Sequence, residues 1–328
     1  MVTLKDVARL AGVTPTTISR MLNNKCNVSA KTRRKIEDAM QTLAYRPNEL
    51  ARSLSKQTSG FIGLIVPSVT QFFFSSVIER VEASAAANGC KLLLCVSNQD
   101  AKKEKEYFNM LMGNRVMGII LCNLTQAVED LGGIDAPLMV LERTPSKSIP
   151  YALSDNYNGG RLAAEHLIDK GCKRLLYFAG NTDVTFSPDP MRRYDGFCDV
   201  CHERGVADPI LWTSDWEEFI AMRYDASIQH MFEACPQTDG ILASNDSIAA
   251  QLIRSCMRRG VRVPEDMKVV GYDDTVFAAS CIVPLTTIHQ PIDELCRFAV
   301  ESIIHRAHGE VVPESTVFPV QLVVREST

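Results

Sequence analysis

From Phe61 onward, short apolar runs alternate regularly with longer segments whose apolar residues recur at helical spacing. Parallel strands need crossover connections, which are usually helices, so this alternation predicts parallel sheets covered by helices on both faces. Residues 60–328 hold enough such units for two sheets, and we therefore predict two Rossmann-like lobes. Ligands bind beyond the carboxyl ends of the strands in such sheets, so the residues at strand ends are candidate site residues.

The predicted elements follow from the spacing of the apolar residues. The predicted strands are Phe61–Val69, Cys90–Ser97, Gly118–Cys122, Leu138–Glu142, Arg174–Ala179, Gly240–Ala243, Met267–Tyr272, Leu285–His289 and, near the end of the chain, Val317–Val324. The predicted helices are Ser75–Asn88, Ala101–Asn114, Gly159–Lys170, Arg193–Arg204, Phe219–Ala234, Asp246–Arg259 and Ile292–His308.

The charge of the chain is distributed unevenly. The whole sequence has a net charge of −4, but residues 1–59 carry +7 and the remainder carries −11. A basic segment joined to an acidic body is typical of a protein that binds a polyanion such as nucleic acid. A solvated basic tail is the alternative, but a tail would not carry the helical pattern of these residues.

Three short helices are predicted within the basic segment. Leu4–Ala11 has apolar residues at i, i+3, i+4 and i+7, with Thr3 as its N-cap and Gly12 as its end. Pro15–Leu22 begins with proline at the first helical position, and Ser29–Leu43 closes a small core. Two helices joined by a turn that contains glycine form a helix-turn-helix, whose second helix fits the major groove of DNA.

Several sequence motifs are similar to a known family. LKDVARLAGVT (4–14), TISRMLN (17–23), VSAKTR (28–33), YRPN (45–48) and ARSL (51–54) closely resemble the headpiece of the LacI/GalR family of bacterial repressors. ILASND, VVGYDD and LTTIHQP (241–246, 269–274 and 285–291) resemble the periplasmic-binding-protein-like core of the same family. The resemblance implies a helix-turn-helix headpiece (1–46), a hinge helix and linker (47–59), and a two-lobed core for effector binding and dimerisation (60–328).

The resemblance implies roles for residues of the headpiece. Pro15, Thr16 and Arg20 match the positions that read bases. Arg20 can bind guanine O6 and N7 together, whereas Pro15 offers apolar contact only and leaves the operator sequence open. The positions that match phosphate contacts are Thr3, Leu4, Thr14, Ser19, Asn23, Asn27, Ser29 and Thr32; hydroxyls and amides there would position the protein without reading sequence.

Asn48–Ser55 is an amphipathic stretch that follows Pro47 and is too short to be helical alone in water. The resemblance implies that it folds as a hinge helix when two copies meet on DNA, with contacts from Asn48, Ala51, Arg52 and Leu54. Leu54 matches a leucine that inserts into the minor groove and kinks the duplex. An ordinary linker is the alternative reading of this stretch.

The resemblance also implies an effector site in the core. Arg193, Asn245 and Asp273 match residues that bind the effector; the matching wall or rim positions are Phe73, Phe74, Glu142, Asp189, Trp216 and Gln290. An arginine and a carboxylate suit vicinal hydroxyls, and an aromatic face suits the C–H surface of a sugar. We therefore expect a small carbohydrate effector, with a purine or another metabolite acting as corepressor as the alternative. Glu142, or Asp246 next to Asn245, could instead be a helix cap or an ion-pair partner.

Other classes of function have less support. The sequence Cys198-Asp-Val-Cys-His202 matches a haem-attachment pattern, but it lies in a predicted helix with core spacing, and packed or exposed thiols are the favoured reading. His305 and His308 lack the companion residues of a metal motif. We find no nucleotide-binding or hydrolase motif and expect no enzyme activity, no catalytic residues, no metal and no cofactor. A periplasmic solute-binding protein would need a signal peptide and would lack the headpiece.

We expect the protein to lie in the cytoplasm, away from membranes. No apolar run approaches 18 residues, the N-terminus lacks a secretory signal, and 11 scattered cysteines suit a reducing compartment. The predicted partners are double-stranded operator DNA, a small-molecule effector and a second copy of the chain. We expect a homodimer rather than a tetramer because the sequence shows no leucine-heptad helix after Arg325. The expected mechanism is allosteric, with effector and DNA each weakening the binding of the other.

Overall fold

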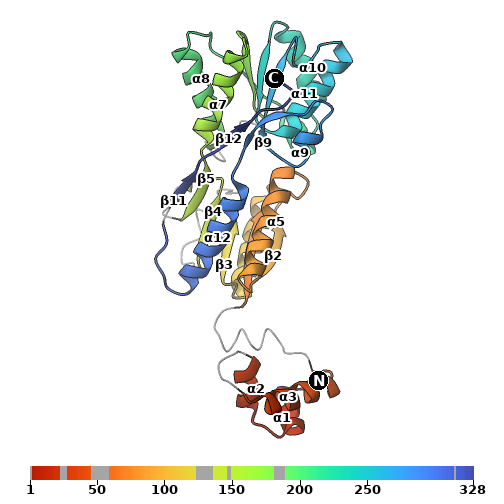
Figure 1. Cartoon of the computed structure of the whole chain (residues 1–328), viewed down its shortest axis with the longest axis vertical. Coiled ribbons are helices and arrows are strands. Elements are labelled where there is room, and N and C mark those ends of the chain that lie inside the picture. The colour runs from red at the N-terminus through yellow and green to blue at the C-terminus, as the bar shows by residue number, and fades with distance from the viewer. Residues whose placement is uncertain are drawn as a thin grey trace. The chain divides into compact units, whose positions relative to one another are not determined.

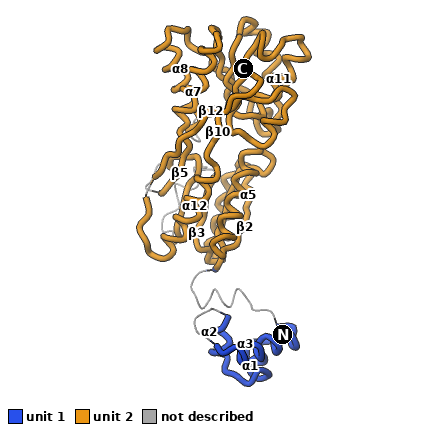
Figure 2. Tube along the Cα trace, in the orientation of Figure 1, with its two compact units in different colours: residues 1–59 blue, residues 60–328 orange. Residues whose placement is uncertain are grey.

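The computed structural model of the chain describes residues 2–22, 28–45, 59–122, 136–145, 149–180, 189–313 and 315–328. The chain forms two compact units, residues 1–59 and residues 60–328, which are coloured separately in Figure 2. The larger unit contains two lobes, each built on a six-stranded sheet (Figure 1). Within the described residues, no helix combines the length and apolar character needed to cross a bilayer.

The first unit is a three-helix core of α1 (Leu4–Ala11), α2 (Pro15–Leu22) and α3 (Ala30–Thr42). One fully buried side chain from each helix, Val7, Ile18 and Ile36, lies in the centre. α1 and α2 have the predicted bounds, whereas Ser29 and Leu43, the predicted ends of the third helix, are the caps of α3. Gly12 ends α1 at a φ of 66°, a left-handed conformation that glycine adopts without a steric penalty.

Lobe 1 has the strand order β11-β5-β4-β3-β1-β2, and every neighbouring pair in it is parallel. Its strands are β1 (Phe61–Val66), β2 (Lys91–Val96), β3 (Gly118–Leu121), β4 (Leu138–Leu141), β5 (Tyr151–Ser154) and β11 (Ser315–Phe318). Its helices are α5 (Phe72–Ala87), α6 (Ala101–Gly113) and α12 (Ile292–Ala307).

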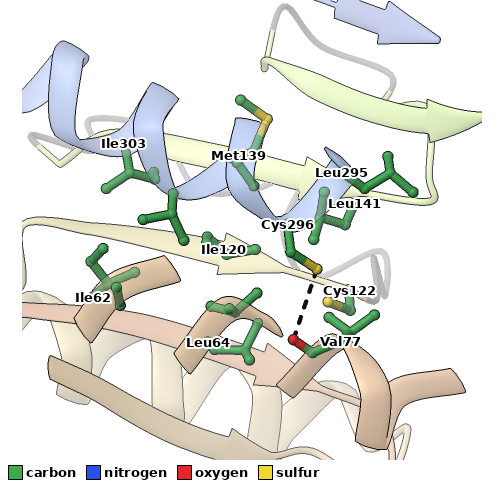
Figure 3. Close-up of a cluster of buried hydrophobic side chains, with 14 of the residues drawn as sticks. Ile62, Leu64, Val77, Ile120, Cys122, Met139, Leu141, Leu295, Cys296 and Ile303 are labelled. Atoms are coloured by element: carbon green, nitrogen blue, oxygen red, sulfur yellow. Dashed lines mark hydrogen bonds between the residues drawn. The ribbon is translucent and has the colours of Figure 1, made fainter. Parts of the chain in front are cut away.

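The sheet of lobe 1 is buried on both faces. Leu64 of β1 packs in a cluster with residues of α5 and α12, which Figure 3 shows in close-up, whereas Ile65 packs on the opposite face with Leu111 of α6. Alternate residues of one strand therefore enter two different cores, as the predicted doubly covered sheet requires.

Lobe 2 has the strand order β12-β10-β9-β8-β6-β7, and β12 alone in this order runs antiparallel to its neighbour. Its strands are β6 (Leu175–Phe178), β7 (Ile210–Trp212), β8 (Gly240–Ala243), β9 (Lys268–Asp273), β10 (Thr286–His289) and β12 (Gln321–Val323). Its helices are α7 (Asn156–Asp169), α8 (Arg192–Glu203), α9 (Trp216–Ala221), α10 (Asp225–Ala234) and α11 (Asp246–Arg259), and the short turns η2 (Asp189–Met191) and η3 (Ala278–Ser280) complete it.

The predicted helix Phe219–Ala234 is wrong, because the structure has two helices there. Met222 adopts a left-handed φ of 53° between α9 and α10. The side chain of Gln251 on α11 bonds the backbone at this break, accepting from Tyr224 N and donating to Met222 O. A partner that lies far along the chain therefore satisfies the backbone groups that the break exposes.

The predicted strand Val317–Val324 is also wrong as a single strand. It is divided at Pro319 between β11, which belongs to the sheet of lobe 1, and β12, which belongs to the sheet of lobe 2. Two short strands, β5 and β7, were not predicted. Phe72, three residues before the predicted start, begins α5.

Candidate functional site

The second helix of the first unit presents its polar side to solvent. Ile18 and Met21 are buried, whereas Pro15, Thr16 and Arg20 are exposed. The three residues predicted to read bases therefore lie on the accessible side of α2, and Arg20 is in its last turn. This is the arrangement that a recognition helix needs to reach base edges in the major groove.

The residues predicted to contact phosphate lie near helix starts. Thr14 Oγ1 accepts from Thr17 N at 3.2 Å, and Ser29 Oγ accepts from Thr32 N at 3.2 Å, so both hydroxyls cap helices. Helix N-termini favour anions, and hydroxyls there suit a phosphate. Thr3 and Leu4 lie at the start of α1, while Ser19 lies within α2 and is half-buried. The predicted contacts Asn23, Asn27, Asn48, Ala51, Arg52 and Leu54 lie outside the described residues.

In lobe 2, Arg193 is held in one orientation by three neighbours. Its Nε donates to Asn156 Oδ1 at 2.6 Å, and its Nη1 donates to Ser244 O at 2.7 Å. Its guanidinium carbon lies 3.5 Å from the ring centroid of Tyr272, a cation–π contact. Burial alone would lower the pKa of Arg193, but Tyr272, Tyr177, Asp273 and Glu142 face it and raise the pKa overall.

Two glycines allow α7 and α8 to approach closely enough for Arg193 of α8 to bond Asn156 of α7. A Cβ on Gly160 would lie 1.8 Å from Arg193 O, and a Cβ on Gly196 would lie 2.1 Å from Tyr157 O. Neither position can hold a side chain unless the helices move apart. The helix pair therefore sets the position of the Arg193 backbone, and Asn156, at the first turn of α7, sets the side chain.

Asp273 and Gln290 meet at neighbouring strand ends of lobe 2. Gln290 Nε2 donates to Asp273 Oδ1 at 2.6 Å, and both side chains are buried. Gln290 Oε1 and the Tyr272 hydroxyl are buried without a hydrogen-bond partner in the described part of the chain. Asp273 has a φ of 109°, a conformation that side-chain-bearing residues rarely adopt. Burial and the nearby Asp246 raise the pKa of Asp273 well above its usual range.

Two further carboxylates come from opposite lobes. Glu142, at a φ of 57° directly after β4, accepts from Ser154 N at 2.6 Å and from Ser154 Oγ at 2.9 Å. Burial raises the pKa of Glu142, although these hydrogen bonds and Arg193 oppose the rise. Asp189, in the short turn before α8, accepts from Thr144 N and from Thr144 Oγ1, each at 2.7 Å. Glu142 and Asp189 both interact electrostatically with Arg143.

The neighbouring Asn245 and Asp246 have local partners. Asn245 Oδ1 accepts from Ile248 N at 2.9 Å and caps α11. Asp246 is fully buried and accepts from Thr275 N, Thr275 Oγ1 and Thr287 Oγ1. Burial raises the pKa of Asp246 to about 6. Asp246 therefore joins the loop after β9 to strand β10 and is a structural residue. It is neither a helix cap nor an ion-pair partner, the two alternatives that the sequence left open.

The aromatic residues fall into two groups. Phe73 and Phe74 are half-buried, with ring centroids 5.3 Å apart, and pack against the core of lobe 1. The preceding Phe72 contacts Phe277 of lobe 2, with ring centroids 4.6 Å apart. Trp216 is 43% exposed at the start of α9 and stacks on Phe219. The rest of the Trp216 side chain is exposed to solvent.

We refer to Glu142, Asp189, Arg193, Asp273 and Gln290 as the candidate effector site. Arg193 of lobe 2 interacts electrostatically with Asp273 of its own lobe and with Glu142 of lobe 1, so residues from both lobes share one electrostatic environment. Four residues that contact or face this site were not predicted from the sequence: Asn156, Tyr272, Thr144 and Arg143. Asn156 follows the unpredicted strand β5, and Arg143 and Thr144 follow Glu142 directly, so attention to every strand end would have found three of these four.

The haem-like pattern lies in α8. Cys201 is fully buried in the lobe 2 core, Cys198 is half-buried, and exposed His202 pairs with Asp208. In the part of the chain that the structure describes, no group of three or more His, Cys, Asp or Glu side chains could hold a metal ion.

Comparison with family models gives two matches. Residues 3–48 match the model described as "Bacterial regulatory proteins, lacI family", and residues 164–328 match the "Periplasmic binding protein-like domain".

Whole proteins match over nearly the full length. The chain is 35% identical to the "Sucrose operon repressor" of Streptococcus mutans, covering 99% of this chain and 98% of the relative. It is 33% identical to the "Ribose operon repressor" of Bacillus subtilis, covering 100% and 99% of the two chains. The solved structure of the lac repressor dimer bound to operator and the anti-inducer ONPF superposes with a TM-score of 0.87 at 28% identity, covering 99% and 98%.

Proposed function

This chain belongs to the lacI family of bacterial regulatory proteins, and from this we infer that it is a sequence-specific DNA-binding repressor of a carbohydrate-utilisation operon, released from its operator by a small sugar. The observation that carries the inference is the combination of a helix-turn-helix unit with a two-lobed core whose strand-end residues surround Arg193. Regulation of transcription, rather than catalysis, follows from this pairing.

The DNA-binding part rests on the exposed side of α2. Pro15, Thr16 and Arg20 lie on it, with Thr14 at its start and Ser29 at the start of α3. We propose that the first three read bases and that the hydroxyls contact phosphates. Phosphate contacts dominate affinity, so we expect operator binding to weaken steeply as salt rises.

The effector part rests on the chemistry of the candidate effector site. Arg193 is held by Asn156 and Ser244 but keeps further N–H groups, and Gln290 Oε1 is a buried acceptor without a partner in the described residues. A sugar hydroxyl both donates and accepts, so a polyol can satisfy both groups at once. Trp216 supplies an aromatic face for the C–H surface of a sugar ring. The relatives named for sucrose and ribose operons support this choice.

We propose that the protein works as a homodimer in the cytoplasm, where a palindromic operator on the chromosome matches its two-fold symmetry. Sugar binding would then favour one arrangement of the two lobes over another, and the arrangement would change the affinity for operator. Linkage requires that sugar and operator weaken each other by the same factor. Sedimentation at micromolar concentration should give a dimer, and a stable tetramer would contradict this part of the proposal.

A regulator of purine metabolism is the second candidate, because the chain is also 31% identical to the "HTH-type transcriptional repressor PurR" of Vibrio atlanticus. One experiment separates the two. A gel shift with DNA from the promoters beside the gene is run with no additive, with neutral mono- and disaccharides, and with purines. Release by a sugar supports the proposal. Tighter binding with a purine supports the alternative, and failure to bind any fragment specifically contradicts both.

A further inference from the structure

Two consecutive residues at the carboxyl end of β9 have backbone conformations that are unusual for residues with a side chain. Asp273 has a φ of 109°, and Asp274 has a φ of 53°. Aspartate tolerates the left-handed region better than most residues do, but a φ as large as that of Asp273 is rare in any residue other than glycine. Such conformations persist only where the surrounding structure holds them, and they gather at ligand sites. The contacts that hold this turn therefore bear on the candidate effector site, to which Asp273 belongs.

The side chain of Asp274 is held by two residues from other parts of lobe 2. Its Oδ1 accepts from Nη2 of Arg325 at 2.6 Å, and its Oδ2 lies 3.0 Å from Nδ1 of His289 on β10. The Asp274 and Arg325 side chains are 16% and 21% exposed, so water screens their ion pair only partly. His289 is 46% exposed. Arg325 is therefore the better shielded of the two partners, and its hydrogen bond is charged at both ends.

Arg325 is itself fixed by its surroundings. Its backbone nitrogen donates to Thr286 Oγ1 at 2.9 Å, and its Nη1 donates to Leu285 O at 2.8 Å. Two residues further on, Ser327 is fully buried, and its Oγ donates to Val269 O on β9 and accepts from Thr286 N on β10. The segment after β12 is thereby tied to both strands. The Arg325 guanidinium thus has a fixed position from which to hold the turn after β9.

The residues on either side of Asp274 have partners of their own. Thr275 N and Thr275 Oγ1 both donate to Asp246 Oδ2, at 2.7 and 2.9 Å. Asp273 Oδ1 accepts from Gln290 Nε2 at 2.6 Å. Each of three consecutive residues is therefore fixed by a different part of lobe 2, and the middle one depends on the ion pair with the segment after β12.

We propose that Arg325 is a positioning residue for the effector: through its ion pair with Asp274, it holds the turn that places the Asp273 carboxylate for ligand binding. This inference rests on the proposed function, in which Asp273 binds the sugar. Arg325 itself does not contact the sugar. Its loss lowers the fraction of molecules in which Asp273 is placed for binding, and the apparent Kd rises by the inverse of that fraction. A residue that acts before binding changes the rate of association, whereas loss of a direct contact chiefly changes the rate of dissociation.

The test follows sugar binding to the full-length protein by tryptophan fluorescence, at equilibrium and by stopped flow, because Trp216 is exposed and is one of two tryptophans in the chain. Sucrose, D-ribose, D-fructose and D-glucose are titrated into the wild type, Arg325→Met and Arg325→Lys. We expect Arg325→Met to raise the Kd of the bound sugar about tenfold, as expected if about one molecule in ten keeps Asp273 in place. The association rate should fall by the same factor, and the dissociation rate should stay unchanged. Arg325→Lys keeps the charge but has fewer donors, so it should recover part of the loss.

Two further variants separate this role from a general loss of stability. Arg262→Met is the matched control, because Arg262 also pairs with an aspartate of lobe 2, Asp266, at 2.6 Å, but this pair precedes the amino end of β9. Thermal unfolding measures the stability that each variant loses, and Arg262→Met should bind sugar as the wild type does. Asp274→Gly removes the partner of Arg325 and accepts a positive φ. It should raise the Kd about as much as Arg325→Met, and the double variant should raise it little further.

The outcomes distinguish the two levels of inference. If the wild type binds none of the four sugars, the proposed sugar effector is wrong and the role of Arg325 fails with it. If the wild type binds a sugar and Arg325→Met binds it equally well, the role of Arg325 is wrong and the proposed function stands. Three other results would also overturn that role: faster dissociation at an unchanged association rate, which indicates a direct contact with the sugar; additive losses in the double variant with Asp274→Gly; and an equal rise of the Kd in Arg262→Met.

Discussion

Asp189 accepts two hydrogen bonds from Thr144, one from its backbone nitrogen and one from Oγ1, each 2.7 Å long. Thr144 lies in the segment after β4 of lobe 1, and Asp189 begins the turn that leads into α8 of lobe 2. A carboxylate of one lobe therefore holds the backbone of the other, one residue away from Arg143. Since hydrogen bonds to a charged group are strong, this contact contributes to the relative free energy of the lobe arrangement in which it forms.

This contact predicts that Asp189 acts on sugar affinity together with Thr144. Thr144→Val removes the hydroxyl donor, and Asp189→Asn removes the charge. We expect each variant to raise the sugar Kd about tenfold, as expected for a weakened charged hydrogen bond. The double variant should raise the Kd by little more than either single variant does. Fluorescence titration of the four proteins measures the coupling. Additive losses would show that Asp189 contacts the sugar independently of Thr144.

Arg193→Ala should give a repressor that sugar no longer releases. The variant removes the remaining N–H groups of Arg193 from the candidate effector site and leaves the separate headpiece unit unchanged. The lost charged hydrogen bond should cost about 1.5–3 kcal/mol, which raises the sugar Kd roughly ten- to a hundredfold or more. A gel shift should show normal operator binding that persists in sugar. Loss of operator binding in this variant would instead indicate misfolding or a direct role in DNA binding.

The sequence predicts the architecture well where the pattern is local. Helical spacing locates α1, α2 and α11 almost to the residue, because one buried stripe is enough to define each helix. The break at Met222 escapes prediction because Gln251, far along the chain, satisfies its backbone groups. The separation of β11 from β12 likewise depends on the packing of two sheets, which a continuous apolar run does not encode.

In the candidate effector site, too, the positions of residues can be predicted from the sequence, but their long-range partners cannot. Strand-end position and family resemblance locate Glu142, Arg193 and Asp273, but the role of each depends on long-range partners. Asn156 fixes Arg193, and Thr144 fixes Asp189, through contacts 37 and 45 residues apart in the chain. A strand-end carboxylate such as Asp246 looks like a ligand in the sequence, yet three hydrogen bonds from threonines make it structural.

Leu54→Ala tests the hinge that the resemblance implies. Leu54 lies outside the described residues, so the prediction rests on the sequence alone. Removing a side chain that wedges into the minor groove should weaken specific operator binding and reduce the bend of the DNA. Non-specific, salt-dependent binding by the basic headpiece and sugar binding by the core should both persist. Operator affinity and DNA bending that both match the wild type would show that residues 48–55 form an ordinary linker.

The buried carboxylate of Asp246 predicts how stability changes with pH. Its pKa rises from 3.8 to about 6 on folding, mainly through burial, so the folded state binds more protons than the unfolded state between these values. A raised carboxylate pKa means that stability is gained at low pH and lost as pH rises through about 6. The loss is on the order of 2–3 kcal/mol at most, because a shift of one pKa unit corresponds to about 1.4 kcal/mol. The nearby Asp274 also contributes to the raised pKa of Asp246, although less than burial does, so its repulsion is already part of this loss.

Asp246→Asn isolates this effect, since asparagine keeps an acceptor for the threonines and does not titrate. The variant loses one of the two carboxylate oxygens that accept from Thr275 and Thr287, so we expect it to be less stable than the wild type at pH 5. At pH 7.5 the wild type bears the full cost of an ionised buried carboxylate, and the difference in unfolding temperature should shrink or reverse. Calorimetry of both proteins at pH 5, 6 and 7.5 measures this difference, in which the titration of all other groups largely cancels. A difference that stays constant across this range would mean that Asp246 titrates at its ordinary pKa despite its burial.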